Sequence, residues 1–197
     1  AYFSGCLTLT LPKYEGTRGE DILFVDVLRT NYTKNYREAI VKNIIPNSYK
    51  DKVQFVSHIS DDLKALDRES RMQQAKQMLD TYAKAKIVFT SLIHCALPCV
   101  ALGTPVVFID FGFNNDRAKR DRFNGIIDLF KIESNLKAPY MDRNLSSKLY
   151  RGLRLIHLNK GNINQLSEEL FKYSETTEKH HPMASSMKAT IKEFYNS

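Results

Sequence analysis

Short apolar runs alternate with amphipathic or polar segments over the first 110 residues of the chain. Residues 22–28 (ILFVDVL) predict a first buried strand, because a run of β-formers lies between two polar stretches. Similar runs predict strands at 53–59, 87–90 and 105–109. Such continuous apolar runs are typical of strands that are covered on both faces, as in a parallel sheet.

Helices are expected between these strands. Apolar side chains recur at helical spacing over residues 34–44 and, most clearly, over 68–84, while 93–102 is an apolar helix that ends at Gly103. Further along, the pattern predicts a helix at 122–130, a helix or mixed segment at 145–158, and a polar helical stretch beyond residue 164 that Pro182 breaks before a last helix near 184–195.

The alternation of strand and helix with short connections predicts an α/β fold, namely a Rossmann-like three-layer domain with a parallel sheet. We expect residues 21–160 to form this domain, residues 1–20 to be a domain-junction segment, and residues 161–197 to form a C-terminal helical extension. Since the chain opens with neither a signal peptide nor a Met, we also expect it to be one domain of a longer protein.

Composition narrows the class of protein. A hydrophobic content of 43% in 197 residues provides a core without disulfides, which excludes a disordered tail or a disulfide-stapled mini-protein. The net charge of +7 is spread along the chain, which favours anionic small molecules over nucleic acid as partners. Residues 87–109 are uncharged, but Pro98, Gly103 and Pro105 divide them into strand, helix and strand, so no transmembrane segment is predicted.

The three cysteines have no framework spacing, and Cys95 and Cys99 lie four residues apart in an apolar segment. We therefore expect both to be buried, unbridged thiols in a cytoplasmic protein. The pair His180-His181 has no ligand spacing to another His or Cys, so no metal site is predicted. The chain also lacks the glycine-rich motifs of nicotinamide dehydrogenases and of P-loop ATPases.

The loop after the strand at 87–90 carries candidate chemistry, because ligands of an open parallel sheet bind beyond the carboxyl ends of its strands. The chain there reads Ser91-Leu92-Ile93-His94, in which Ser91 is a natural helix N-cap and His94 lies in the first turn. Free amides, a hydroxyl and an imidazole would together attract a phosphate or carboxylate and exchange a proton with a bound hydroxyl. The alternative is that His94 is a core histidine bonded to a carbonyl.

The loop after the strand at 105–109 is the densest basic cluster of the chain. Arg122 offers a planar fork and Lys119 a point charge, so this loop is a candidate clamp for an anionic donor. The alternative is a solvated loop in which the basic residues pair with Asp116 and Asp121.

Four segments together resemble the polysaccharide pyruvyl transferase family. They are residues 4–11 (SGCLTLTL), the helix around 67–85, the block 90–110 (TSLIHCALPCVALGTPVVFID) and residues 121–126 (DRFNGI). The resemblance covers about residues 3–130, and the combination is far more specific than any one motif.

The resemblance implies the C-terminal half of a GT-B-like enzyme, with an N-terminal domain as a partner. Such enzymes transfer an enolpyruvyl group from phosphoenolpyruvate to a sugar hydroxyl of a cell-surface glycan and so form a pyruvate ketal. The acceptor would be a glycan or lipid-linked sugar, and no cofactor is implied because phosphoenolpyruvate is a substrate. His94 falls on the histidine of the family motif and is the candidate acid/base; the candidate substrate-binding residues are Gly5, Thr90, Ser91, Lys119 and Arg122.

One position departs from the family pattern. The family commonly has an Arg directly before the hydrophobic residue and the His of the motif, and Leu92 stands there in this chain. Either a basic residue of the 117–122 loop replaces it, or the donor differs, or the fold serves another transfer. The alternatives are a nucleotide-sugar-dependent GT-B glycosyltransferase domain and a non-catalytic glycan-assembly domain.

Overall fold

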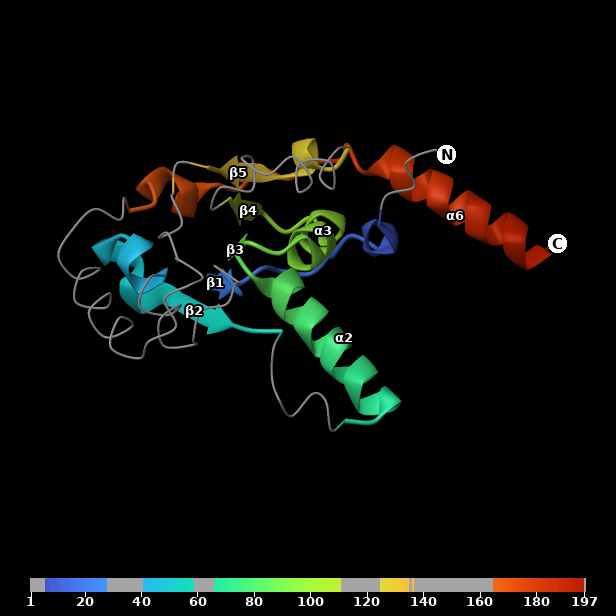
Figure 1. Ribbon diagram of the computed structural model, residues 1–197, viewed down its shortest axis with the longest axis horizontal. Coiled ribbons are helices and arrows are strands. Elements are labelled where there is room, and N and C mark those ends of the chain that lie inside the picture. Colours follow the sequence, from blue (N-terminus) through green and yellow to red (C-terminus); the bar gives the residue numbers. More distant parts are fainter. Residues whose placement is uncertain are drawn as a thin grey trace, which may run out of the picture.

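The computed structural model describes residues 6–27, 41–58, 66–110, 125–134, 136 and 165–196. The described strands form one sheet in the order β2-β1-β3-β4-β5, and every neighbouring pair is parallel (Figure 1). The strands are β1 (Ile22–Val25), β2 (Val53–Val56), β3 (Ile87–Thr90), β4 (Val106–Ile109) and β5 (Lys131–Glu133). The four predicted strands and their parallel arrangement are therefore confirmed, with β1 and β2 shorter than expected.

The central strands of the sheet are buried on both faces. All residues of β1, β3 and β4 are buried, which explains why these strands read as uninterrupted apolar runs. The edge strand β2 is only partly buried. Since Val25 pairs with both Val56 and Thr90, the carboxyl ends of β2, β1 and β3 meet at one edge of the sheet.

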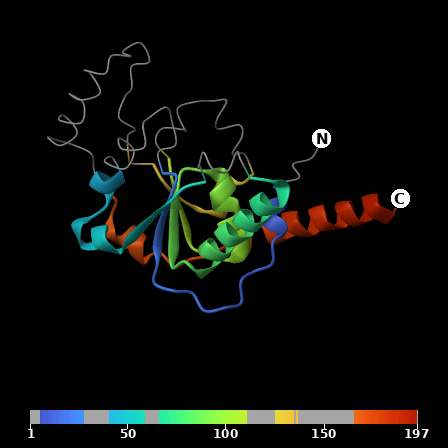
Figure 2. The ribbon, with the colours of Figure 1, turned by 90° about the horizontal axis from the view of Figure 1, so that it is seen from below.

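One face of the sheet is covered by α2 (Arg68–Lys84), α3 (Ile93–Leu102) and the 3-10 turn η1 (Leu7–Thr10) (Figures 1 and 2). The start of α6 (His181–Asn196) packs on η1. α3 packs closely because all of its residues from Cys95 to Leu102 are buried. Cys95 and Cys99 are buried free thiols, so that prediction is confirmed. α3 ends at Gly103, whose φ of 69° favours glycine, as the sequence predicted.

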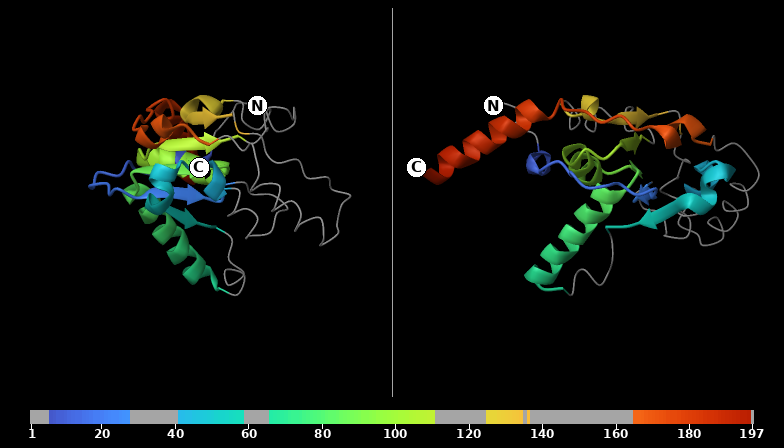
Figure 3. Two further views of the ribbon diagram at one scale, coloured as in Figure 1. Left: turned by 90° about the vertical axis from the view of Figure 1, so that its left-hand side faces the viewer. Right: turned by 180° about the vertical axis from the view of Figure 1, so that it is seen from behind.

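The other face is covered by the helical residues 41–44 and the 3-10 turns η2 (Asn47–Lys52) and η6 (Glu168–Lys172) (Figure 3). Phe171 of η6 anchors this layer, with its ring centroid 4.7 Å from that of Phe89 and 4.4 Å from that of Tyr49. Phe24 stacks on Phe89 at 4.7 Å in the same cluster. The expected three-layer α/β arrangement is therefore present.

α2 packs on the sheet only near its carboxyl end. Asp67 caps the helix by accepting a hydrogen bond from the amide of Ser70 at 2.7 Å. Tyr82 and Ala83 are buried, but Met72, at the other end of the predicted apolar stripe, is 55% exposed. Figure 1 shows the reason, because the amino-terminal part of α2 projects away from the sheet.

Arg18 ties the ends of α2 and α3 together. Its guanidinium donates hydrogen bonds to the carbonyl oxygens of Ala83, Leu102 and Gly103 and to the Oγ1 of Thr104. These carbonyls lie at helix ends, where no intrahelical donor remains for them. One side chain thus satisfies the last turns of both helices.

Two expectations for the later part of the chain are wrong. The helix expected at 122–130 is, in its described residues, only the 3-10 turn η5 (Ile127–Leu129) before β5, because Gly125 at a φ of 85° interrupts a helical path. The stretch beyond residue 164 was expected to be helical, but it forms only the short 3-10 turn η6 and is then non-helical over residues 173–178. Leu170 and Phe171 of η6 are buried in the core, and their packing sets the path of this segment.

Pro182 does not precede the last helix but lies in the first turn of α6, where its missing N–H costs no hydrogen bond. The segment predicted at 145–158 lies outside the described residues, as does most of the helix predicted at 34–44. No helix among the described residues is long and apolar enough to cross a membrane.

Candidate functional site at the carboxyl edge of the sheet

The strand order places a topological switch point between β1 and β3. The chain leaves β1 toward β2 on one side and later returns to β3 on the other side. In open α/β sheets the crevice beyond the carboxyl ends of two such strands is where ligands bind. The residues that follow β1 and β3 are therefore the first to be considered.

The turn from β3 into α3 is built differently from the prediction. Ser91 is not the N-cap: its buried hydroxyl donates to the carbonyl oxygen of Ile109 at 2.9 Å and so links β3 to β4. Leu92 is the N-cap and has no side-chain cap bond. Thr90 takes part of the capping role, since its Oγ1 accepts from the amide of Leu92 at 3.0 Å. The N-cap was thus predicted one residue too early.

His94 lies in the first turn of α3, beside this edge of the sheet, and its side chain is exposed. The alternative of a buried core histidine is therefore wrong. The structure brings His94 together with Thr90 and Ser91, whose hydroxyls hold the turn on which it stands. The other predicted site residues, Gly5, Lys119 and Arg122, lie outside the described residues.

A hydrogen-bonded cluster that the sequence analysis did not select lies at the same edge. Asp26 follows β1, and its carboxylate accepts from the Ser57 hydroxyl at 2.6 Å, from the His58 amide at 2.8 Å and from the His58 Nδ1 at 2.9 Å. The Nε2 of His58 lies 2.6 Å from the phenol oxygen of Tyr82 in α2. β1, β2 and α2 are joined by this cluster.

Asp26 has a backbone conformation that residues other than glycine rarely adopt. Its φ is 43° and it is only 7% exposed. Burial alone would raise the pKa of Asp26, but hydrogen bonds from His58 and Ser57 outweigh burial and hold that pKa below its ordinary value. The carboxylate is therefore ionised at neutral pH and only accepts hydrogen bonds, so the Nδ1 of His58 carries a proton.

Tyr82 completes the cluster from the interior. Burial, together with the neighbouring thiols of Cys95 and Cys99, raises the pKa of Tyr82, so its phenol stays protonated and donates a hydrogen bond to the Nε2 of His58. Both ring nitrogens of His58 are thus engaged by the protein. His94 is in consequence the imidazole at this edge with freer access to a ligand.

The switch-point rule would have identified this cluster. Asp26 directly follows the apolar core of the first strand, and His58 follows the second strand two residues after Val56. Residues at the carboxyl ends of neighbouring parallel strands meet at one edge. Tyr82 carries no such signal, because in sequence it is one more apolar position on a helix.

The comparisons with known proteins agree with this geometry. Residues 1–112 match the family model described as polysaccharide pyruvyl transferase. This chain belongs to the polysaccharide pyruvyl transferase family. The match includes β1 to β4 and the turn that carries His94, and the suspected resemblance is confirmed. The search of curated proteins and the search of solved structures found no match.

Membership of a polysaccharide pyruvyl transferase family supports a transferase and a saccharide-related role. Among the residues that the structure describes, no three His, Cys, Asp or Glu side chains are grouped as a metal ion would require. The described part of the site offers hydroxyls, imidazoles, a carboxylate and helix amides.

Proposed function

We propose that this chain takes part in the transfer of an enolpyruvyl group from phosphoenolpyruvate to a sugar of a cell-surface glycan. The exposed His94 at the start of α3, beside the β1/β3 switch point of a pyruvyl transferase family member, is the observation that supports the proposal. The first turn of α3 directs free backbone N–H groups and the positive end of the helix dipole toward an anion.

In the proposed reaction the methylene carbon of the donor gains a proton, which leaves an electron-poor carbon for a sugar hydroxyl to attack. Phosphate then leaves with the C–O bond electrons, and a second hydroxyl of the same sugar closes the ketal. One hydroxyl proton replaces the proton given to the methylene carbon, and the other leaves with phosphate. His94 is the group that carries protons between these positions.

The remaining parts of the proposed site follow from the sequence. Arg122, with Lys119, would hold the phosphate or carboxylate of the donor and replace the Arg that the family has at the position of Leu92. Gly5, in the segment expected at a junction with an N-terminal domain, would lie beside the donor. No cofactor is needed, and we propose a cytoplasmic enzyme of the exopolysaccharide or cell-surface glycan class with a GT-B-like arrangement.

His94→Asn tests this function. Asn keeps much of the shape and hydrogen bonding of His but has no group that titrates near neutral pH. The rate of phosphate release from phosphoenolpyruvate in the presence of a glycan acceptor should therefore fall about 10²- to 10⁴-fold. His181→Asn, at an exposed histidine in α6, is the matched control and should retain full turnover. Full turnover in His94→Asn would show that His94 is not the acid/base, and loss of the fold would show that its role is structural.

The donor is tested separately. Phosphoenolpyruvate should raise the melting temperature of the full chain, because a ligand that binds only the native state stabilises it. Arg122→Ala should weaken this effect without removing the proton chemistry. Stabilisation by uridine or guanosine sugars instead of phosphoenolpyruvate would contradict the proposed donor and favour a nucleotide-sugar glycosyltransferase.

A further inference from the structure

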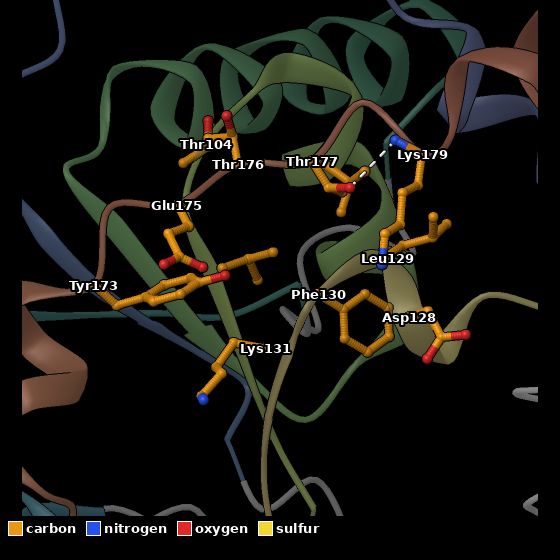
Figure 4. A pocket seen from close by; sticks show the side chains of 12 residues that line it. Thr104, Asp128, Leu129, Phe130, Lys131, Tyr173, Glu175, Thr176, Thr177 and Lys179 are labelled. Carbon is orange, nitrogen blue, oxygen red and sulfur yellow. Dashed lines mark hydrogen bonds between the residues drawn. The ribbon is translucent and has the colours of Figure 1, made fainter.

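A cavity of about 330 Å³ lies at the edge of the sheet opposite the switch point (Figure 4). It is lined by the amino-terminal ends of β4 and β5, by residues 128–130 before β5, by the last part of α3, and by residues of the segment 173–179. In Figure 4, Tyr173 and Glu175 lie on the side away from Leu129 and Asp128, while Lys179 lies beside Leu129. Its volume is at the lower end of the range of about 300–1,000 Å³ that small-molecule sites occupy.

The lining of this cavity is apolar on its inner side. Val100, Val106, Leu129 and Phe130 contribute aliphatic and aromatic surface. Thr104 adds only its methyl group, since its hydroxyl already donates to the carbonyl of Tyr82 and accepts from Arg18. A ligand with an apolar face thus has a surface to pack against.

The outer wall is polar and of mixed charge. Glu175 and Asp128 contribute carboxylates, and Lys131 and Lys179 contribute ammonium groups, so the formal charge of the wall is zero. Glu175 and Tyr173 lie next to each other in Figure 4, and burial and then the Glu175 charge raise the pKa of Tyr173. The phenol therefore keeps its proton and is a hydrogen-bond donor beside a carboxylate acceptor.

These properties select among ligand classes. A multiply charged anion is disfavoured, because the two carboxylates of the wall balance its two ammonium groups and leave no net positive charge. A purely apolar ligand would leave the charged wall without partners. A pyranose ring has C–H faces for the apolar inner side and hydroxyls that both donate to carboxylates and accept from ammonium groups.

We propose that this cavity is an accessory saccharide site that takes one or two neutral sugar rings. The choice of a glycan rests on the proposed function, whereas the amphipathic lining stands without it. The cavity and His94 lie at opposite edges of the sheet, and Val100 in the cavity wall comes six residues after His94 in α3, which is roughly 9 Å at 1.5 Å per residue. A sugar bound here is therefore away from the transfer chemistry and would be another unit of the acceptor glycan.

Titration of the ¹⁵N-labelled full chain with cellotetraose and chitotetraose, followed by amide chemical shifts, tests the proposal. Saturable shifts of the Lys131, Thr176 and Thr177 amides with either probe are expected. Inorganic phosphate is the contrasting probe and should leave these three amides unshifted. Absence of saturable shifts up to about 10 mM of both sugars, well above the ~1 mM dissociation constants of weak sites, would overturn the proposal. So would sugar-induced shifts confined to the carboxyl edge.

Variants separate this site from the transferase function. Glu175→Gln should weaken sugar binding by about tenfold or more, because a hydrogen bond to a charged group is replaced by a neutral one. Glu169→Gln is the matched control, at an exposed carboxylate of η6 outside the cavity. His94→Asn should leave sugar binding intact even if it abolishes turnover. Equal binding by Glu175→Gln and Glu169→Gln would contradict the proposed site, whatever the outcome for His94.

Discussion

Asp26→Asn should destabilise the domain by about 3 kcal/mol. The Asp26 carboxylate accepts three hydrogen bonds, two of them from His58. In the Asp26→Asn variant one of the two acceptor oxygens is replaced by an NH₂ group, which cannot accept a hydrogen bond from the donors that face it. A hydrogen bond to a charged group contributes about 1.5–3 kcal/mol, so losing one and weakening the others gives this magnitude. Asn tolerates the positive φ of this position about as well as Asp, which isolates the charge from the backbone conformation.

Urea unfolding and thermal unfolding measure the effect. For a chain of this length, 3 kcal/mol corresponds to a fall in melting temperature of about 6–12 °C. Asp21→Asn is the control: Asp21 is exposed and accepts from Gln54 at 2.7 Å, so its substitution should cost less than about 0.5 kcal/mol.

The pH dependence provides a second check. Because the pKa of Asp26 is lowered by folding, its contribution is present above the unfolded value of about 3.8 and is lost as the pH falls through the folded value. The stability difference between wild type and Asp26→Asn should therefore narrow as the pH falls below about 4. A variant as stable as wild type at pH 7, or a difference that is the same at pH 7 and pH 3, would refute the reasoning.

Three further predictions concern the scaffold. His180 is buried, its Nδ1 has no hydrogen-bond partner among the described residues, and burial and then His181 lower its pKa. The free energy of unfolding should therefore decrease as the pH falls below about 6.5, because the unfolded chain takes up the proton more readily. In urea unfolding, His180→Gln should reduce this pH dependence. Arg18→Met should lower the free energy of unfolding by about 3 kcal/mol, because the carbonyls at the helix ends lose their hydrogen-bond donor. Lys13→Met is the control: Lys13 is exposed, and its substitution should lower the free energy of unfolding by less than about 0.5 kcal/mol. Cys99, whose pKa burial raises, should resist thiol reagents in the native state; rapid labelling would contradict its packing.

Much of the fold is predictable from sequence because the central strands are buried on both sides. β1, β3 and β4 leave the strongest pattern available, a continuous apolar run between polar turns. β5 leaves almost none, since Lys131 and Glu133 flank a single apolar residue at the edge of the sheet. Its pairing with β4 is set by tertiary contact, which local periodicity does not report.

The candidate site divides in the same way. The position of His94 at the start of α3 follows from a strand and a helix that are both well marked in sequence. The roles of the two hydroxyls before it do not follow, because Ser91 is bonded to Ile109, a residue 18 positions away in the neighbouring strand. Whether a serine caps its own helix or bonds a distant carbonyl depends on packing that capping preference alone does not include.

The aromatic cluster around Phe171 has a consequence for the synthesis of this chain. Phe24, Phe89 and Tyr49 are all made well before Phe171, the ring that covers them. Ribosomes add about 5–20 residues per second, so after β4 is complete the nascent sheet keeps an uncovered aromatic face for several seconds. During that interval the emerging chain exposes an apolar surface of the kind that chaperones bind, and a chain terminated before residue 171 would lack the ring that covers it.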